Sequence, residues 1–167
     1  YAEKRVALVI GNSSYQNVTR LDNPRNDAGL MADTLGALGF TLVGGRAQLD
    51  LDKPAMDLAV QNFGRQVQGA DVALFYYAGH GVQLAGENYL VPVDARVSSE
   101  PDLVNGSLRL VDVMATLEAI PSRVRIVILD ACRNNPFPSL SDAGRGFAIV
   151  DAPTGSIVAY SKAPGTQ

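Results

Sequence analysis

The sequence predicts an α/β protein with a mainly parallel sheet flanked by helices on both faces. Short apolar runs rich in β-branched residues recur along the 167-residue chain, and each is typical of a buried strand. Several segments between these runs repeat their apolar residues at helical spacing. The two kinds of segment alternate, as they do in right-handed βαβ crossovers. We expect one domain over residues 1–167, because neither an internal repeat nor an interdomain linker interrupts the pattern.

Five strands and three helices account for most of the chain. We expect the strands at residues 5–10, 40–43, 72–77, 125–129 and 156–160. We expect the helices at 23–38, 52–68 and 111–120, where the apolar residues share one face and glycine or proline follows the last turn. An irregular hairpin over 81–95 and loops at 12–22 and 133–154 complete the order.

Capping signals mark where the first two helices begin. Asn23 is a suitable cap, and Pro24 then occupies the first helical position, where proline is well tolerated. Asp52 is a suitable cap for the second helix, whose apolar residues from Met56 to Val67 follow the spacing of one buried face. Both helices therefore have sequence-encoded starts as well as apolar faces.

The only cysteine and the only histidine each follow the end of a predicted strand. Strand 125–129 is followed by Asp130 and, two residues later, by Cys132. Strand 72–77 is followed closely by His80. In an open parallel sheet, functional groups collect beyond the carboxyl ends of the strands. We therefore expect Cys132 and His80 to lie close together.

A cysteine beside a histidine is suited to nucleophilic catalysis. The thiolate is the attacking form, and an imidazole can accept the proton of a thiol whose free pKa is about 8.5. Backbone N–H groups of Gly81 and Cys132 would then stabilise the oxyanion, a contribution of roughly 3 to 4 kcal/mol per donor in known enzymes. Taken singly, a lone cysteine is commonly a buried small hydrophobic residue and a lone histidine a core or surface residue. The hypothesis therefore depends on the pair.

Composition excludes several other functions. The net charge is −3 and no basic block is present, which argues against nucleic acid and against an anionic membrane surface as partners. No apolar run approaches the roughly 20 residues of a membrane span. One cysteine permits neither an internal disulfide nor a cysteine-rich zinc site. The stretch Gly11-Asn12-Ser13-Ser14 matches neither the Walker loop nor the dinucleotide fingerprint, which disfavours a nucleotide-binding or flavodoxin-like function.

Two stretches 52 residues apart resemble the catalytic signatures of caspase-like cysteine peptidases: Tyr77-Ala78-Gly79-His80-Gly81 and Asp130-Ala131-Cys132-Arg133. Three more stretches make bacterial metacaspase-type (orthocaspase) domains the most similar group. They are residues 6–12, Asn26-Asp27-Ala28 and residues 159–165. The resemblance covers the chain in order. It implies a three-layer, flavodoxin-resembling caspase-like fold and a catalytic domain that is truncated at its C-terminal end.

The resemblance assigns roles to four residues of a cysteine endopeptidase. His80 matches the general base and Cys132 the nucleophile. Asp27 and Asp130 match two acids that line the S1 pocket. Two carboxylates favour a guanidinium or ammonium group, so we expect cleavage after Arg, then Lys, instead of the acidic residue that caspases recognise. Alternatively, Asp27 is an acid favoured in a first helical turn by the helix dipole, and Asp130 is a loop acid that accepts bonds from backbone N–H groups.

Departures from the family pattern lead to further expectations. Eukaryotic metacaspases carry an acidic cluster that binds activating calcium, whereas residues 106–110 hold no acid here. Asp94 and Asp112 alone are a poor site for a cation that takes 6 to 8 oxygens, so we expect no cofactor and calcium-independent activity. Arg145, in the long loop after the nucleophile, is a candidate autocleavage site. The partners expected are a peptide or protein substrate and the missing C-terminal segment of the same chain.

Two alternatives stay open at this stage. The domain is either an active peptidase or a catalytically silent caspase-like binding or scaffold domain, and the intact Cys–His pair favours the peptidase.

Tyr1-Ala2 before Glu3-Lys4-Arg5 is consistent with the end of a signal-peptide cleavage site, and equally with a cloning boundary. Because bacterial relatives often carry an export signal there, we expect an exported or periplasmic protein in preference to a cytoplasmic one.

Overall fold

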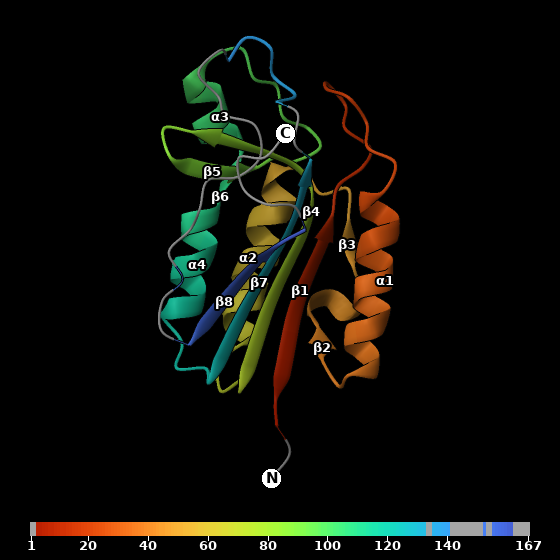
Figure 1. Ribbon diagram of the computed structural model, residues 1–167, viewed down its shortest axis with the longest axis vertical. Coiled ribbons are helices and arrows are strands. Elements are labelled where there is room, and N and C mark those ends of the chain that lie inside the picture. The colour runs from red at the N-terminus through yellow and green to blue at the C-terminus, as the bar shows by residue number, and fades with distance from the viewer. Residues whose placement is uncertain (1–2, 133–134, 141–151, 153–154, 162–167) are drawn as a thin grey trace.

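A twisted parallel sheet forms the centre of the protein. The computed structural model describes residues 3–132, 135–140, 152 and 155–161 (Figure 1). The parallel strands are β1 (Arg5–Gly11), β2 (Thr41–Leu42), β3 (Gln48–Leu49), β4 (Val72–Leu84), β7 (Val124–Cys132) and β8 (Ser156–Tyr160). They lie in the order β2, β1, β4, β7, β8, and β3 pairs with the far end of β1. The parallel part of β4 reaches the upper edge in Figure 1 together with the carboxyl ends of β1 and β7, and the last residues of β4 curve away from there.

Helices cover both faces of this sheet, as the sequence predicts. Helix α1 (Pro24–Ala37) packs on one face, where its apolar residues meet alternate residues of β1 and β4. Helices α2 (Lys53–Gln66) and α4 (Leu110–Glu118) pack on the other face and enclose the larger apolar cluster. The arrangement is a three-layer α/β fold, which confirms the predicted fold class. Among the described residues, no helix has the length and apolar character needed to cross a membrane.

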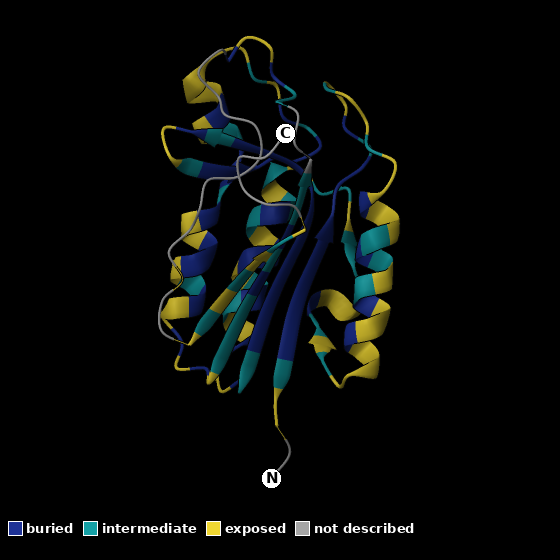
Figure 2. Cartoon of the chain, viewed as in Figure 1, coloured by how far each residue is buried: buried dark blue, intermediate teal, exposed yellow. Residues whose placement is uncertain are grey.

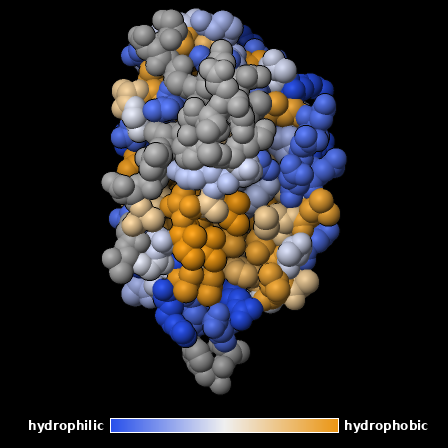
Figure 3. All heavy atoms as spheres, viewed as in Figure 1, coloured by the Kyte–Doolittle hydropathy of each residue, from blue (hydrophilic) through white to orange (hydrophobic). Residues whose placement is uncertain are grey.

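Burial decreases from the central strands to the edge. Nearly every residue of β1 and β4 is buried, because both of their faces are covered (Figure 2). Strand β8 alternates between half-buried and exposed residues, and Ile157 on it is 56% exposed. Figure 3 shows apolar side chains gathered over this front part of the sheet, where Ile126 and Ile128 of β7 are half-buried.

Two strands are longer than the sequence predicts. The pairing of β4 with β7 continues to the His80–Cys132 pair, so both residues lie within strands and not after them. From Gly81 onward β4 pairs with β5 (Glu87–Leu90) in the antiparallel direction. Small and polar residues in 78–84 favour a turn locally, but hydrogen bonds to two different neighbouring strands keep the segment extended. The predicted ends at residues 77 and 129 were therefore wrong.

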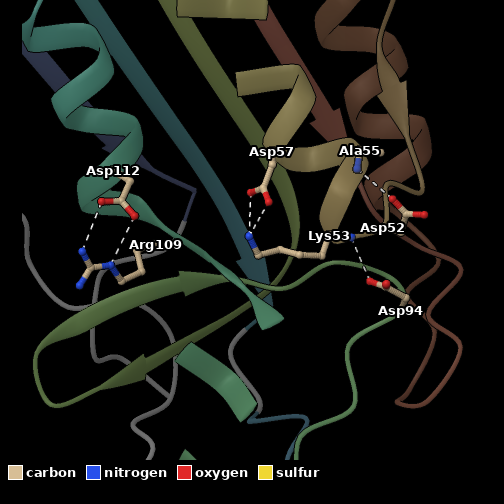
Figure 4. Close-up of polar contacts among 7 residues, drawn as sticks. All are labelled: Asp52, Lys53, Ala55, Asp57, Asp94, Arg109 and Asp112. Atoms are coloured by element: carbon tan, nitrogen blue, oxygen red, sulfur yellow. Dashed lines mark hydrogen bonds and ion pairs between the residues drawn. The ribbon is translucent and has the colours of Figure 1, made fainter. Parts of the chain in front are cut away.

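The remaining differences concern short elements. A 3-10 helix η1 (Val43–Gly45), helix α3 (Glu100–Gly106) and strand β6 (Leu108–Arg109), like β3, were not predicted. The predicted hairpin is present as β4–β5, with its turn at Ala85 and Gly86, both of positive φ. Asn23 occupies the N-cap of α1 without a side-chain cap bond, whereas Asp52 caps α2 by accepting the Ala55 N–H at 2.9 Å (Figure 4).

Candidate active site

The register of β4 and β7 brings the predicted site residues together. Ala78 lies opposite Asp130, and His80 lies opposite Cys132. These are the last pairs of the parallel ladder, at the carboxyl edge of the sheet (Figure 1). Because the side-chain period of a strand is two, Asp130 and Cys132 occupy positions on one face of β7. The backbone thus places the predicted base and nucleophile on neighbouring strands at one level.

His80 has one hydrogen-bonded and one free ring nitrogen among the described residues. Its side chain is buried, and Nε2 lies 2.7 Å from the carbonyl oxygen of Thr19. A carbonyl only accepts, so Nε2 carries the proton in this contact. In the neutral imidazole, Nδ1 then keeps its lone pair, and the described part of the chain offers this buried atom no hydrogen bond. The ring is therefore held in the tautomer whose Nδ1 can accept a proton.

Thr19 lies in the loop between β1 and α1, which contacts the site although its sequence indicates only a polar connection. Asp50 fixes the start of this loop, since one of its carboxylate oxygens accepts the N–H groups of Ser13 and Ser14, each at 2.9 Å. Further along, the N–H of Leu21 donates to the carbonyl of Ser13 at 3.0 Å. Thr19 was missed because a backbone carbonyl leaves no signal in the residue type.

Asp27 and Asp130 line one small pocket. Its volume is about 150 Å³, and its walls come from the β1–α1 loop, the first turn of α1, β4 and β7. The lining residues are Leu21, Asp22, Asn23, Pro24, Asp27, Ala78, Gly79 and Asp130. The two acids predicted from the resemblance are thus adjacent in space although they are far apart in sequence. Asp22 adds a third carboxylate, which sequence reasoning missed.

Hydroxyl groups hold both oxygens of Asp130. Ser161 Oγ donates to Oδ1 at 2.7 Å, and the hydroxyl of Tyr76 donates to Oδ2 at 3.3 Å. Asp130 itself lies in β7 and not in a loop. The described contacts thus differ from those of a loop acid that accepts backbone N–H groups, which was the alternative for this residue. They fix the carboxylate at the pocket wall.

Proximity of the acids changes the ionisation of their neighbours. Desolvation, followed by the charge of Asp130 and a hydrogen bond to it, raises the pKa of Asp27 above the ordinary value of 3.8. Burial, followed by the charges of Asp130 and Asp27, also raises the pKa of Tyr76. The location of Asp27 in the first turn of α1 agrees with the helix-dipole alternative as well, and one carboxylate can satisfy both roles. A nearby positive charge would therefore favour the ionised form of these acids.

Two further predicted site residues are Gly81 and Arg145, and the structure describes only the first of them. Gly81 follows His80 within β4 and lies opposite Leu90 of β5, so its backbone is part of a buried ladder at the site. Its role as an oxyanion donor stays a prediction. Arg145 lies outside the described residues.

We predict that Asp27→Asn increases the free energy of unfolding at pH 7. The folded state raises the pKa of this carboxyl, so the wild-type chain loses stability as pH rises from the unfolded pKa through the folded pKa. Above the raised pKa the ionised Asp27 is unfavourable beside Asp130, and Asn removes that cost. Below the ordinary value of 3.8 the two proteins should differ little. Urea unfolding at both ends of this range measures the difference.

Asp33→Asn is the matched control, because Asp33 is an exposed acid on the same helix. Its effect on the free energy of unfolding at pH 7 should be small. A decrease in stability for Asp27→Asn at pH 7 would contradict the prediction, since it would mean that the ionised Asp27 is stabilising.

Comparisons with known proteins show which family the chain resembles. A family model described as "Caspase domain" matches residues 4–167. The human protein "Mucosa-associated lymphoid tissue lymphoma translocation protein 1" is 31% identical over 132 residues, which are 79% of this chain and 15% of that protein. Its mouse homologue is 32% identical over 132 residues, with the same two coverages of 79% and 15%. The chain thus spans about 15% of the length of these curated relatives.

A solved structure provides an independent comparison of the fold. The structure of pro-Sf-caspase-1 superimposes with a TM-score of 0.60 and covers 96% of this chain and 62% of its own. Sequence identity between the two is 12%, so this likeness concerns the fold alone. The family match over residues 4–167 shows that the chain belongs to the caspase-domain family of cysteine peptidases.

Proposed function

We propose that this protein is a cysteine endopeptidase that cleaves after Arg and, less efficiently, after Lys. The observation that carries the proposal is the alignment of His80 with Cys132 beside a pocket lined by Asp27 and Asp130. The pair would supply the base and the nucleophile, and the pocket would bind the basic side chain before the cleaved bond.

The chemistry begins with proton transfer from the Cys132 thiol to Nδ1 of His80. The thiolate attacks the carbonyl carbon of the substrate, and the N–H groups of Gly81 and Cys132 stabilise the resulting oxyanion. The intermediate collapses to a thioester as the imidazolium gives its proton to the leaving amine. A water molecule then hydrolyses the thioester and regenerates the thiol. Through all these steps the Thr19 carbonyl accepts a hydrogen bond from the Nε2–H group of His80 and stabilises the imidazolium.

The preference for a basic side chain follows from charge. Desolvation, followed by the charge of Asp130, raises the pKa of Asp27, and a bound guanidinium would offset the repulsion between the two carboxylates. Arg is preferred to Lys because its planar fork can engage carboxylates with two hydrogen bonds, whereas an ammonium acts as a point charge. An acidic side chain would bring a further negative charge against Asp22, Asp27 and Asp130.

Hydrolysis of paired fluorogenic peptides tests the proposal directly. A peptide with Arg before the reporter should be cleaved, a matched peptide with Asp should not, and Cys132→Ala should abolish cleavage of both. Cleavage of the Asp peptide would support the peptidase activity but reject the proposal that the Asp27–Asp130 pocket binds a basic side chain. If a folded wild-type protein cleaves neither peptide, with or without calcium, the domain is a catalytically silent binding or scaffold domain.

We further propose that activity is independent of calcium. Asp94 Oδ1 accepts the N–H of Lys53 at 3.0 Å, and Asp112 forms an ion pair with Arg109 at 3.3 Å. Figure 4 shows these two acids on separate parts of the chain, each engaged with its own partner. Within the described ranges, no group of three or more His, Cys, Asp or Glu side chains is suitably placed to hold a metal ion. These contacts support the proposal, because each acid already has a partner of its own and the two do not share one site.

Raising calcium from a chelated baseline to about 1 mM, the weak end of protein calcium sites, should therefore change the rate on the Arg peptide by less than twofold. Magnesium at the same concentration controls for ionic strength. A large, saturable increase that calcium alone produces would contradict calcium independence.

We also propose the metacaspase-type variant of the family, with autoprocessing at Arg145 in a longer precursor. An enzyme that cleaves after Arg can cut its own chain where Gly144 and Gly146 flank an arginine. Arg145→Ala in an intact precursor should abolish the processed fragments seen on a denaturing gel, while Lys162→Ala should leave them in place. Unchanged processing in Arg145→Ala would reject this site.

A further inference from the structure

Two buried tyrosines hold the backbone of His80 from both sides. The N–H of His80 donates to the hydroxyl of Tyr15 at 2.8 Å. The hydroxyl of Tyr77 donates to the carbonyl of His80 at 2.6 Å. Tyr15 comes from the β1–α1 loop and Tyr77 from β4, and their hydroxyls lie 3.3 Å apart. Both polar backbone groups of His80 are therefore bound by side chains from two different parts of the chain.

The same hydroxyls connect His80 to the next strand segment. Tyr15 donates to the carbonyl of Val91 at 3.0 Å, and Tyr77 lies 3.2 Å from the same oxygen. The N–H of Val91 in turn donates to the carbonyl of His80 at 3.1 Å. Because these groups are buried, each of these bonds is costly to lose without a replacement. The network therefore defines one position for the His80 backbone.

Tyr15 also contacts the imidazole itself. The two ring centroids are 4.5 Å apart with an interplanar angle of 59°, a tilted aromatic contact. Thr19 lies four residues further along the same loop, and its carbonyl accepts a hydrogen bond from the Nε2–H group of His80. One loop thus sets the backbone position, one ring face and the tautomer of His80.

Gly79 provides the space for this arrangement. A Cβ atom at this position would lie 2.5 Å from the Tyr77 hydroxyl and 2.7 Å from the Tyr15 hydroxyl. Both distances are too short for any side chain. Glycine before His80 is therefore required by the positions of the two tyrosine hydroxyls.

We infer that Tyr15 is a positioning residue for the general base His80, acting with Tyr77. This inference rests on the proposed function. Without its hydroxyl, the buried N–H of His80 would lose its acceptor, and the imidazole could shift relative to Cys132. A displacement of about 1 Å in a catalytic group can cost roughly 100-fold in rate. Substrate binding should change little, since the Asp27–Asp130 pocket makes no use of Tyr15.

The test is Tyr15→Phe, which keeps the ring and removes the hydroxyl. On the Arg peptide, kcat per titrated active site should fall about 10- to 100-fold while KM stays within about twofold. Alkylation of the single cysteine by iodoacetamide, a reagent too small to need the pocket, should slow in parallel because formation of the thiolate depends on His80. A purely structural role would instead reduce the number of titratable sites and leave kcat per site unchanged.

Tyr89→Phe is the matched control. Tyr89 is buried in the same apolar cluster as Tyr15, and its hydroxyl takes no part in the described hydrogen bonds around His80. It should leave kcat, KM and the alkylation rate as in the wild type. Tyr77→Phe should resemble Tyr15→Phe, and the double variant should lose less than the product of the two single losses. If Tyr15→Phe does not fold, the Tyr77→Phe variant carries the test.

The outcomes separate this inference from the proposed function. If the wild type cleaves no peptide but its cysteine is alkylated more slowly in Tyr15→Phe, the proposed function fails and the positioning role stands. If the wild type is active and Tyr15→Phe keeps both its kcat per site and its alkylation rate, the positioning role is rejected and the peptidase remains. A loss explained entirely by fewer titratable sites rejects the positioning role as well.

Discussion

The site depends above all on the register in which β4 pairs with β7. Nine parallel pairs run from Val72–Val124 to His80–Cys132. A shift of one residue would move every side chain of one strand to the opposite face of the sheet. The observed register puts His80 level with Cys132, and Tyr76 within reach of Asp130. The apolar residues earlier in both strands are buried between helical layers, so packing of the core fixes the geometry of the chemistry.

Most of the layered fold could be predicted from the sequence, because long apolar runs and helical periodicity reflect burial directly. The missed elements have two to seven residues and depend on pairing with distant segments, which local patterns do not report. The predicted ends of β4 and β7 were wrong for the same reason, because pairing with distant strands extends both of them. His80, Cys132, Asp27 and Asp130 could be found from residue type and family pattern. Thr19 acts through its backbone, and Tyr15 is one aromatic residue in a mainly polar loop, so neither gave a comparable signal.

The pocket shows how the fold accepts a local cost at a functional position. Asp27 and Asp130 are close enough to raise the pKa of Asp27, an arrangement that burial and repulsion both disfavour in the empty protein. Hydroxyls of Tyr76 and Ser161 hold Asp130 in place in spite of this. Local conflicts of this kind are expected where a ligand of opposite charge completes the site. Under the proposed function, a basic substrate side chain would supply that charge, and the stability lost in the free protein would contribute to its binding.

The β1–α1 loop joins the two halves of the site. Its start is anchored by Asp50, a residue with a φ of 54° that also pairs with Arg25 at 3.5 Å. From there the loop contributes Tyr15 and Thr19 to His80, and then Asp22 to the wall of the pocket, directly before α1 begins. The loop therefore carries groups that contact His80 and one of the three acids of the pocket, while Asp27 lies on α1 and Asp130 on β7. Under the proposed function, a movement of this loop would therefore affect both the position of His80 and the wall of the pocket.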